Sequence, residues 1–450
     1  MENKDIKVAF KTIGCKVNQY ETESVREAFN KNGYTVVDFK EKADVYLINT
    51  CAVTREAERK SKQMIRKARR SNPLGTIIVT GCGVQTNLEE IKDCSDANCH
   101  IISNYFKDDI FNIYSKYSTK FKVKSSQKLV HFKPAAQINQ YSENNLLSTN
   151  DRIRVRGMVK IQDGCNQFCS YCVIPYLRGR ARSRASKEIL LEIKELIKNG
   201  YKEVVLLGIN LGSYGEDLKS ENINLAKLIK MIEENSDITR IRLSSIELPW
   251  VTDELINVFN DSLKVCHHLH ISLQSGDDNT LSLMRRKYDT TKFEEIVKKI
   301  ERNLPDVAIT TDIIVGFPGE DESAFKRTYK FLKRIGFAKI HVFPYSERPM
   351  TLASLLPFKN EPEIIKARVK VLNKLSIQLR KKFFIKNINQ EKNILVEHSF
   401  RKNDEEYVCG LTDNYIKVCI KGLQMKKGEM ITARLKAVFD FYVEGEEITN

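Results

Sequence analysis

The sequence has no apolar run near the roughly 18–20 residues that a helix needs to cross a bilayer. Its first residues lack the apolar core of a signal peptide, so we expect a cytoplasmic protein with no membrane partner. Only 20 glycines and 10 prolines are present, too few for a collagen-like or wholly disordered chain. The 11 cysteines are too few and too uneven in spacing for a disulfide scaffold. In a reducing compartment, such cysteines favour metal binding or catalysis.

The chain carries an excess of positive charge. Its 450 residues predict two to four domains, and 74 lysines and arginines against 58 acidic residues give a formal charge of +16. This excess favours a polyanionic partner such as nucleic acid, because each neutralised phosphate releases a counterion. Charges that are simply solvated are the alternative.

Residues 1–115 alternate between short apolar strands and helices. The predicted strands are Lys7–Thr12, Val45–Asn49 and Thr76–Thr80, and Thr54 is the predicted cap of a basic helix. Strands separated by helices predict an N-terminal parallel α/β sheet domain. Residues 116–150 are polar and aperiodic, which favours a linker with at most one edge strand.

The alternation resumes over residues 151–386. Six strands are predicted, at Val155–Ile161, Glu203–Leu207, Arg240–Ser244, Leu269–Leu273, Ala308–Val315 and Lys339–Phe343. A closed TIM barrel has eight, so we expect an open, partial (β/α)6 TIM-like barrel that ends with a long basic helix. The short strands within residues 387–450 predict a small antiparallel β-barrel. The fold class is therefore α/β and multidomain.

Three cysteines lie within eight residues, directly after the first strand of the second region. Cys165, Cys169 and Cys172 have the spacing that lets one loop wrap three thiolates around a metal centre. A structural zinc site needs four ligands, and no fourth cysteine or histidine follows within thirty residues. Three ligands on a [4Fe–4S] cluster leave one iron open to a substrate. A zinc knuckle is the alternative.

Three further cysteines each follow a predicted strand of the N-terminal sheet. Cys15, Cys51 and Cys82 are far apart in the sequence. The carboxyl ends of parallel strands share one rim, where ligands collect. The three thiolates can therefore hold a second cluster, and scattered buried cysteines are the alternative. Cys409 and Cys419 lie in predicted strands of the small barrel and are expected to be free thiols that pack as small hydrophobic residues.

These cysteines and their neighbours resemble the radical S-adenosylmethionine (SAM) methylthiotransferases over essentially the whole chain. The similar segments are Thr12–Glu21, Asn49–Thr54, Thr80–Cys82, Gly164–Cys172, Ile174–Arg184, Leu207–Gly215, His270–Gly276, Gly316–Glu320 and Phe343–Ser346. The string KVNQYE after Cys15 is closest to the MtaB branch, which modifies N6-threonylcarbamoyladenosine (t6A) in tRNA. The C-terminal barrel resembles a TRAM domain, an RNA-binding module. Ser272, Leu248 and Met350 depart from the pattern of the branch and leave details of the SAM pocket and of substrate selectivity open.

The resemblance implies that the chain converts t6A at position 37, next to the anticodon, to its 2-methylthio derivative (ms2t6A). It implies two [4Fe–4S] clusters, SAM, the tRNA anticodon stem-loop, a sulfur donor, and an external electron donor such as flavodoxin or ferredoxin. Alternative substrates within the family are isopentenyladenosine in tRNA and an aspartate of a ribosomal protein. An alternative of another class is a zinc-dependent RNA-binding protein without catalysis.

The resemblance also assigns roles to individual residues. The six cysteines named above are the predicted catalytic residues and cluster ligands. The predicted SAM-binding residues are Tyr171, Gly208, Asn210, Ser272, Gln274, Thr311, Asp312, Gly316, Gly319, Val342 and Phe343.

RNA contacts are predicted from the basic stretches. In an extended loop, alternate residues share one side, and the residues predicted to contact RNA are Arg178, Arg180, Arg182 and Arg184, with Arg66 and Arg70. Tyr407 and Tyr415 are predicted to stack on bases. The solvated face of a helix is the alternative for Arg66 and Arg70.

Overall fold

The computed structural model describes residues 6–94, 98–120, 128–138, 140–141, 154–402, 405–422 and 425–448. Its contacts divide the chain into two compact units. The first contains residues 1–149, 160–192 and 346–354, and the second contains residues 150–159, 193–345 and 355–450. The predicted borders at 115, 150 and 386 do not coincide with this division and stay predictions. Among the described helices, none combines the length and apolar character that a membrane span requires.

The first unit contains a six-stranded parallel sheet in the order β2-β1-β3-β4-β5-β6. Its strands are β1 (Lys7–Thr12), β2 (Thr35–Val37), β3 (Val45–Thr50), β4 (Thr76–Gly81), β5 (Cys99–Ile102) and β6 (Leu129–His131). The three strands predicted from sequence are confirmed. The strand β6 falls within the predicted linker and extends the sheet, while residues 121–127, 139 and 142–150 of that linker lie outside the described residues.

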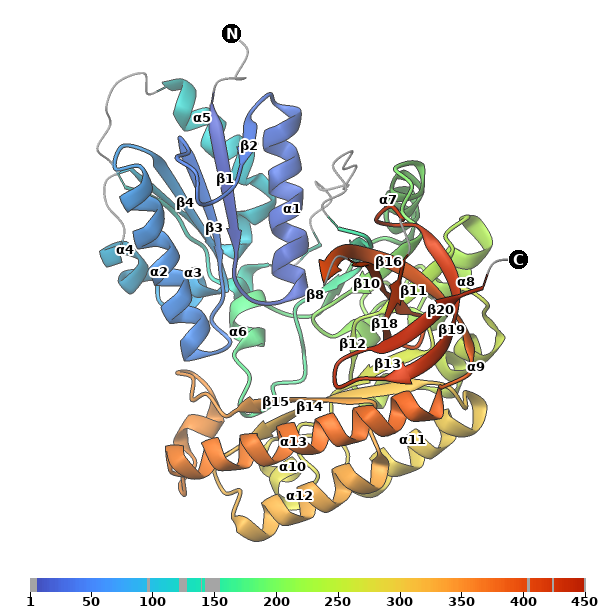
Figure 1. Ribbon diagram of the computed structural model, residues 1–450. Coiled ribbons are helices and arrows are strands. Elements are labelled where there is room, and N and C mark those ends of the chain that lie inside the picture. The colour runs from blue at the N-terminus through green and yellow to red at the C-terminus, as the bar shows by residue number, and fades with distance from the viewer. Residues whose placement is uncertain are drawn as a thin grey trace. The chain divides into compact units, whose positions relative to one another are not determined.

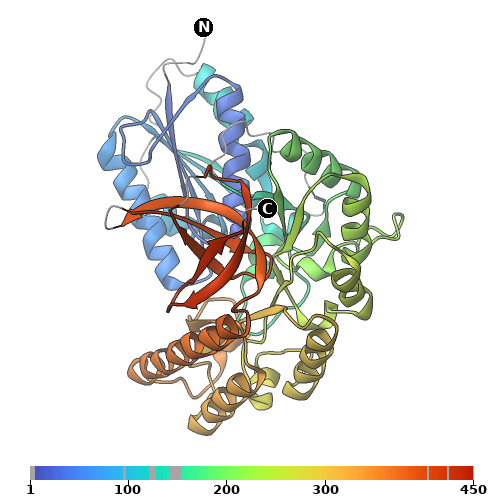
Figure 2. The same cartoon turned by 45° about the vertical axis from the view of Figure 1, so that its right-hand side comes forward.

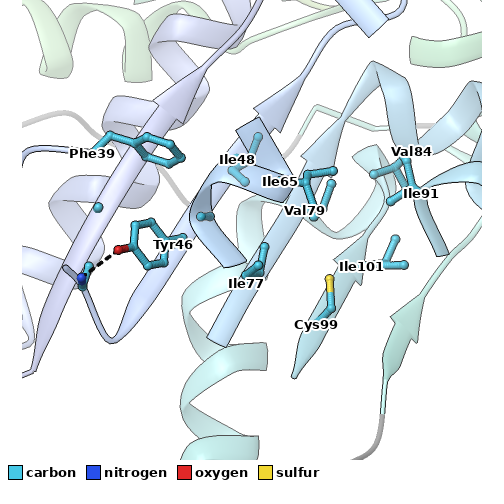
Figure 3. Close-up of a cluster of buried hydrophobic side chains, with 13 residues drawn as sticks. Phe39, Tyr46, Ile48, Ile65, Ile77, Val79, Val84, Ile91, Cys99 and Ile101 are labelled. Carbon is cyan, nitrogen blue, oxygen red and sulfur yellow. Dashed lines mark hydrogen bonds between the residues drawn. The ribbon is translucent and has the colours of Figure 1, made fainter. Parts of the chain in front are cut away.

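Helices cover both faces of this sheet (Figure 1). On one face, α1 (Lys16–Lys31) and α5 (Ile110–Lys120) pack through an aromatic cluster centred on Phe29. On the other face, α2 (Arg55–Ser71) and α4 (Leu88–Cys94) pack on the cluster drawn in Figure 3, which includes Tyr46 and Ile65. The Thr54 side chain accepts a 3.1 Å hydrogen bond from the Ala57 amide and caps α2, as predicted.

The remaining elements of the first unit are short. They are α3 (Cys82–Thr86), the hairpin strands β8 (Gln162–Asp163) and β9 (Arg182–Ser183), and α6 (Ile174–Arg178) between them. The helix α7 (Ser186–Lys198) begins in this unit and ends in the second. Turns of 3-10 helix lie at Asn104–Asp109 and Ala135–Gln137 in this unit and at Leu211–Ser213 and Leu248–Trp250 in the second. Another, at Leu352–Leu355, begins in the first unit and ends in the second.

The second unit contains the predicted partial barrel. Its strands form two sheets, β11-β10-β7 and β12-β13-β14-β15. Their bounds are β7 (Gly157–Lys160), β10 (Glu203–Leu207), β11 (Arg240–Leu243), β12 (Ser245–Ile246), β13 (His268–Ile271), β14 (Ala308–Val315) and β15 (Lys339–Pro344). Only Ser244 separates β11 from β12, so the two short strands act as one position in a row of six, and the predicted open (β/α)6 barrel is confirmed.

Helices lie along the outside of these strands (Figure 2). They are α8 (Leu225–Asn235), α9 (Asp253–Asp261), α10 (Asp278–Leu283), α11 (Thr290–Asn303), α12 (Glu322–Ile335) and α13 (Pro362–Lys386). The side chains of Asn224, Thr252, Asp289 and Asp321 cap four of them, which fixes where each helix begins.

Residues 391–447 form a closed five-stranded barrel in the order β16-β17-β18-β20-β19. The strands are β16 (Glu391–Lys402), β17 (Glu405–Thr412), β18 (Lys417–Lys421), β19 (Met430–Val438) and β20 (Val443–Glu447). The small barrel is confirmed, but its expected all-antiparallel pairing is wrong, because β18 and β20 pair in parallel.

Two predictions about single residues of this barrel are also wrong. Cys409 and Cys419 were expected to be free thiols in a hydrophobic core, yet they face each other across β17 and β18 and form a disulfide. The Tyr415 ring, expected to stack on bases, stacks on His268 of β13 with ring centroids 4.2 Å apart. Arg242 of β11 donates to the carbonyls of residues 412 and 413, so the Tyr415 turn docks the barrel on the second unit's sheet.

Candidate functional site

Cys15, Cys51 and Cys82 lie at the carboxyl ends of three neighbouring strands of the first unit. Cys15 follows β1 and precedes α1, Cys51 directly follows β3, and Cys82 directly follows β4. The strands β1, β3 and β4 are adjacent and parallel, so the three residues share one rim of the sheet. The second cysteine triad predicted from sequence is thus brought together by the fold.

Close packing holds the first two of these cysteine loops against each other. A Cβ atom on Gly14, which has φ +106°, would lie 2.8 Å from the Cys51 sulfur, so only glycine fits beside Cys15. Burial, together with the nearby Cys82, raises the pKa of the Cys51 thiol to about 12. Burial also raises the pKa of Cys82, while Arg178 opposes that shift. Binding of a metal that requires thiolates would therefore release protons.

Asn18, in the first turn of α1, joins the loops that carry Cys15 and Cys51. Its side-chain amide donates to the carbonyls of Ile13 (2.9 Å) and Thr50 (3.1 Å), which immediately precede the two cysteine loops. Its amide oxygen accepts from Arg178 Nη2 at 2.6 Å and lies 3.8 Å from the Cys15 sulfur. Asn18 therefore links the positions of two ligands to a buried cation.

Arg178 is the centre of a buried ionic network next to these cysteines. It is 1% exposed and donates to both carboxylate oxygens of Glu21 (2.9 and 3.1 Å) and to Asp163 (3.0 Å). Lys107 and Lys160 pair with the same two carboxylates. Burial alone would raise the pKa of Glu21, but Arg178 and the two lysines hold it well below its usual range.

The arginines that were predicted to line one side of an extended loop do not do so. Arg178 ends α6, Arg182 begins β9, and Gly179 between them has φ +76°. Arg178, Arg182 and Arg184 are buried, and each pairs with a carboxylate: Arg182 with Asp163 and Arg184 with Glu192. The prediction that these three arginines are exposed to RNA is wrong, because each is buried and its positive charge neutralises a buried carboxylate.

Arg180, in the same segment, is exposed. Its guanidinium lies over the Phe168 ring at 4.7 Å. On α2, Arg66 and Arg70 are exposed as expected. A role in RNA binding stays a prediction for these three residues.

The loop with Cys165, Cys169 and Cys172 also belongs to the first unit. It begins at Gly164, where φ is +72° and a Cβ would lie 1.9 Å from the Arg180 carbonyl oxygen. The amide of Cys165 donates to the Gly179 carbonyl (3.1 Å), and that of Cys172 donates to the Cys169 carbonyl (3.0 Å). Backbone hydrogen bonds therefore hold both ends of the loop, and all three cysteines are partly exposed.

The two cysteine triads approach each other through α6. Cys82 packs in one apolar cluster with Ala52, Val173 and Leu177. Val173 directly follows Cys172 in the chain, and Leu177 lies on α6. Asn104 reinforces this contact, because its amide donates to the Leu177 carbonyl at 2.9 Å and lies 3.9 Å from the Cys82 sulfur. The first unit thus holds both triads in one region.

The spacing of the sulfurs does not match a single zinc ion. Zinc–sulfur bonds of about 2.3 Å in a tetrahedron place sulfurs roughly 3.8 Å apart. Among the described residues, the three ligand atoms that gather within 4.8 Å belong to His267, Asp306 and Asp413, and no cysteine triad does so. In that group, Asp306 already pairs with the ammonium of Lys392 at 2.6 Å, so its charge is neutralised without a metal ion. Three cysteines at each site are the donor type that binds the irons of a [4Fe–4S] cluster.

Most predicted SAM residues lie at the carboxyl ends of strands in the second unit. These are Gly208 and Asn210 after β10, Ser272 and Gln274 after β13, Gly316 and Gly319 after β14, and Val342 and Phe343 within β15. Tyr171 is in the first unit, between Cys169 and Cys172, and is partly exposed. Phe343 is 45% exposed. The second-unit residues therefore share one rim of the partial barrel, as the prediction of a SAM site requires. Their contact with SAM stays a prediction.

Some of these residues already have partners within the sheet. The Thr311 hydroxyl is fully buried, donates to the Ile271 carbonyl at 2.6 Å and accepts from the Leu273 amide at 3.0 Å. Asp312 pairs with His270 at 3.2 Å. A Cβ on Gly316 would meet Ile365 at 2.4 Å, so α13 requires glycine at that position.

Sequence reasoning missed the residues that hold the triads in place. Asn18 and Glu21 lie in the quoted string KVNQYE, but their partner Arg178 is 160 and 157 positions away. Asn104 and Lys107 lie in a 3-10 turn with no distinctive pattern. The one signal in the sequence was that charged residues lie close to the cysteines, such as Glu21 after Cys15 and Asp163 before Cys165.

Known protein families match the two regions of the chain that carry the two cysteine triads. Residues 7–103 match the model of "Uncharacterized protein family UPF0004", and residues 159–332 match that of the "Radical SAM superfamily". The chain is 40% identical to "Threonylcarbamoyladenosine tRNA methylthiotransferase MtaB" of Bacillus subtilis (strain 168), over 98% of this chain and 96% of that protein. It is 34% identical to "tRNA-2-methylthio-N(6)-dimethylallyladenosine synthase" of Thermoanaerobacter sp. (strain X514), over 99% and 88%.

Among solved structures, the fold is similar to that of the radical S-adenosylmethionine methyltransferase TsrM from Kitasatospora setae. The TM-score is 0.57 at 14% sequence identity, over 78% of this chain and 77% of the other. At this identity the likeness concerns the fold alone.

Proposed function

The chain belongs to the radical SAM methylthiotransferase family, and from this premise we propose that it converts t6A at position 37 of tRNA to ms2t6A. The observation that carries the substrate assignment is the identity to relatives named for threonylcarbamoyladenosine, 36–40%, against 33–34% for those named for dimethylallyladenosine. Dimethylallyladenosine in tRNA (isopentenyladenosine) is therefore the second candidate substrate.

We propose that each cysteine triad holds one [4Fe–4S] cluster. Cys165, Cys169 and Cys172 would hold the cluster that binds SAM, and Cys15, Cys51 and Cys82 the auxiliary cluster. Bound clusters and SAM supply the radical chemistry, methyl group and site for sulfur that a methylthio transfer needs. The proposal also requires a sulfur donor and an external electron donor such as flavodoxin or ferredoxin.

The chain's own residues position the ligands. The Asn18 amide fixes the loops of Cys15 and Cys51, and Asn104 donates toward Cys82. Arg178 places a buried positive charge beside thiols that become anionic on binding metal, which favours the thiolate. No histidine or carboxylate is needed as a general base in this arrangement.

Nucleoside mass spectrometry of tRNA tests the substrate. In a strain without this gene we expect ms2t6A to be lost while the methylthio form of isopentenyladenosine persists. Complementation with the wild-type gene should restore ms2t6A, whereas Cys15→Ala and Cys165→Ala should not. Cys266→Ala is the matched control, because Cys266 is buried but belongs to neither triad. Loss of the isopentenyl form instead would refute the t6A assignment.

Iron analysis of anaerobically reconstituted protein tests the cofactors. We expect about eight irons in the wild type and about four after either Cys15→Ala or Cys165→Ala. Zinc in place of iron would exclude the enzymatic proposal altogether.

A further inference from the structure

A cavity of about 220 Å³ lies in the second unit, where the C-terminal barrel meets the first residues of β14 and β15. Its wall combines Thr310 of β14, Lys339 of β15, Arg380 of α13 and Lys417 of β18. The predicted SAM residues Gly316 and Gly319 come after the other end of β14. Because the strand β14 spans eight residues at about 3.3 Å each, the cavity is separate from those positions.

The charged residues in the wall of this cavity are all basic. They are Lys339, Arg380 and Lys417, and no aspartate or glutamate is among the lining residues. Arg380 donates to the main-chain oxygen of Asp440 at 2.7 Å, and the Asp440 carboxylate pairs with Lys381. Among the described residues, the wall of the cavity thus presents three positive charges and no carboxylate, and Asp440, which acts on Arg380 from outside the wall, is paired with Lys381.

This imbalance distinguishes the cavity from the larger one, of about 480 Å³, in the first unit. There, Lys107, Lys160 and Arg182 also line the wall, but Glu21 and Asp163 lie between them and pair with them. The cavity in the second unit has the same kind of cations and lacks the internal anions.

Burial also destabilises the charged forms of two cations in the second-unit cavity. Burial, with Arg380 nearby, lowers the pKa of Lys339, and burial lowers the pKa of Arg380. The Arg380 Nε donor is buried without a hydrogen-bond partner among the described residues. Both groups would gain stability from an anion that accepts their hydrogen bonds.

Aromatic rings form another part of the wall. Phe383, Phe384 and Phe441 line the cavity, and the Arg380 guanidinium lies 4.9 Å from the centre of the Phe441 ring. The volume is several times that of one water, about 30 Å³. An oxyanion attached to a flat or apolar group thus fits both the charge and the size. A phosphate group carried by a nucleotide has this chemistry, and the arginine fork matches its oxygens.

We propose that this cavity binds the phosphate group of a nucleotide, either a phosphodiester of bound RNA or the phosphate of a free nucleotide. The inference does not depend on the chemistry at the cysteine triads. It adds a binding site at the opposite strand ends of the partial barrel.

The test uses the full-length reconstituted protein and three substitutions. Arg380→Met and Lys339→Met remove charges from the cavity, and Lys374→Met is the matched control, an exposed lysine on the same helix as Arg380. Calorimetric titrations use inorganic phosphate and AMP, with chloride at equal ionic strength as the reference. A wild-type urea unfolding curve shows that each variant is folded, because the cavity and the cysteine triads lie in different units and iron content would not report on the second unit. Arg380→Lys, which keeps the charge, serves as a second variant should Arg380→Met fail to fold.

We expect saturable phosphate or AMP binding by the wild type and the Lys374→Met control, and at least tenfold weaker binding by both cavity variants. If RNA is the source, Arg380→Met also lowers the slope of log K against log salt for tRNA binding by about one. If a free nucleotide is the source, AMP binds at least tenfold more tightly than phosphate and the tRNA slope stays at the wild-type value. Absence of saturable binding to the wild type, with equal tRNA slopes for all variants, overturns the proposal. Equal binding by the cavity and control variants overturns it as well.

Discussion

The buried network around Arg178 allows a quantitative test of its structural role. Arg178→Met removes four hydrogen bonds, two to Glu21, one to Asp163 and one to Asn18. Breaking a buried ion pair destabilises a protein by about 3–5 kcal/mol. Lys107 and Lys160 still neutralise Glu21 and Asp163 in the variant, so we expect the lower end, about 3 kcal/mol.

Urea denaturation of the anaerobic protein measures this loss. With a slope of about 2–3 kcal/mol/M, a loss of 3 kcal/mol lowers the midpoint for the first unit by about 1 M. The comparison variant is Arg180→Met, whose exposed side chain contacts the Phe168 ring and contributes only about 0.5–1 kcal/mol.

Binding to tRNA should distinguish Arg178→Met from Arg180→Met in the opposite way, because here the exposed arginine is expected to have the larger effect. Arg180→Met should lower the slope of log K against log salt by about one, whereas Arg178→Met should leave it unchanged, because a buried guanidinium reaches no phosphate. A wild-type urea midpoint for Arg178→Met, together with a lower salt slope, would refute the structural reading.

Three further predictions concern other parts of the chain. Burial raises the pKa of Glu320 to about 7, so the folded state binds the proton more tightly than the unfolded state does. The free energy of unfolding therefore falls as the pH rises from about 4.5 to 7. In urea titrations at pH 5 and pH 8, Glu320→Gln should reduce the difference in unfolding free energy between the two pH values by about 2–3 kcal/mol. Arg242→Lys removes the guanidinium that donates to two carbonyls of the barrel, which should weaken the docking of the barrel by about 2 kcal/mol. Because this free energy corresponds to a factor of roughly 30 in the population of undocked barrel, trypsin should release the C-terminal barrel roughly 30-fold faster. Alkylation of the denatured, unreduced protein should modify the eight described free cysteines and leave Cys409 and Cys419 unmodified. Reduction of this disulfide should destabilise the barrel by about 3 kcal/mol. Modification of both cysteines without reductant would contradict the last of these.

Local patterns in the sequence predicted the strands and the cysteine triads. The strand Lys7–Thr12 and the strand Ala308–Val315 have the predicted bounds, because apolar, β-branched runs between helices leave little choice. The rim that collects Cys15, Cys51 and Cys82 follows from strand direction alone once the sheet is parallel. The strands and the shared rim required only neighbours in the sequence and one rule of topology, whereas the choice of a cluster over scattered buried cysteines rested also on the family resemblance.

Long-range pairing explains what the sequence did not reveal. The alternation of Arg178, Arg180 and Arg182 indicated an extended, exposed loop, but Glu21 and Asp163 bury two of the three. Nothing local distinguishes a guanidinium that meets a phosphate from one that meets a carboxylate 157 residues away. Likewise, the sequence around Tyr415 is that of an exposed turn, and only the fold shows that His268 of β13 stacks on its ring.

The disulfide shows the opposite case, in which a local rule was available. In the hairpin of β17 and β18, paired residues have numbers that add to a constant, so Tyr407 faces Lys421 and Cys409 faces Cys419. The turn residues Asp413 and Asn414 lie at the centre of that hairpin and favour a tight reversal there. Once this turn is placed, the register sets the two cysteines opposite each other, at a Cα separation of 4.2 Å. A cysteine in a β-barrel therefore has to be read together with the residue that its hairpin places across from it, because burial alone does not distinguish a free thiol from a disulfide.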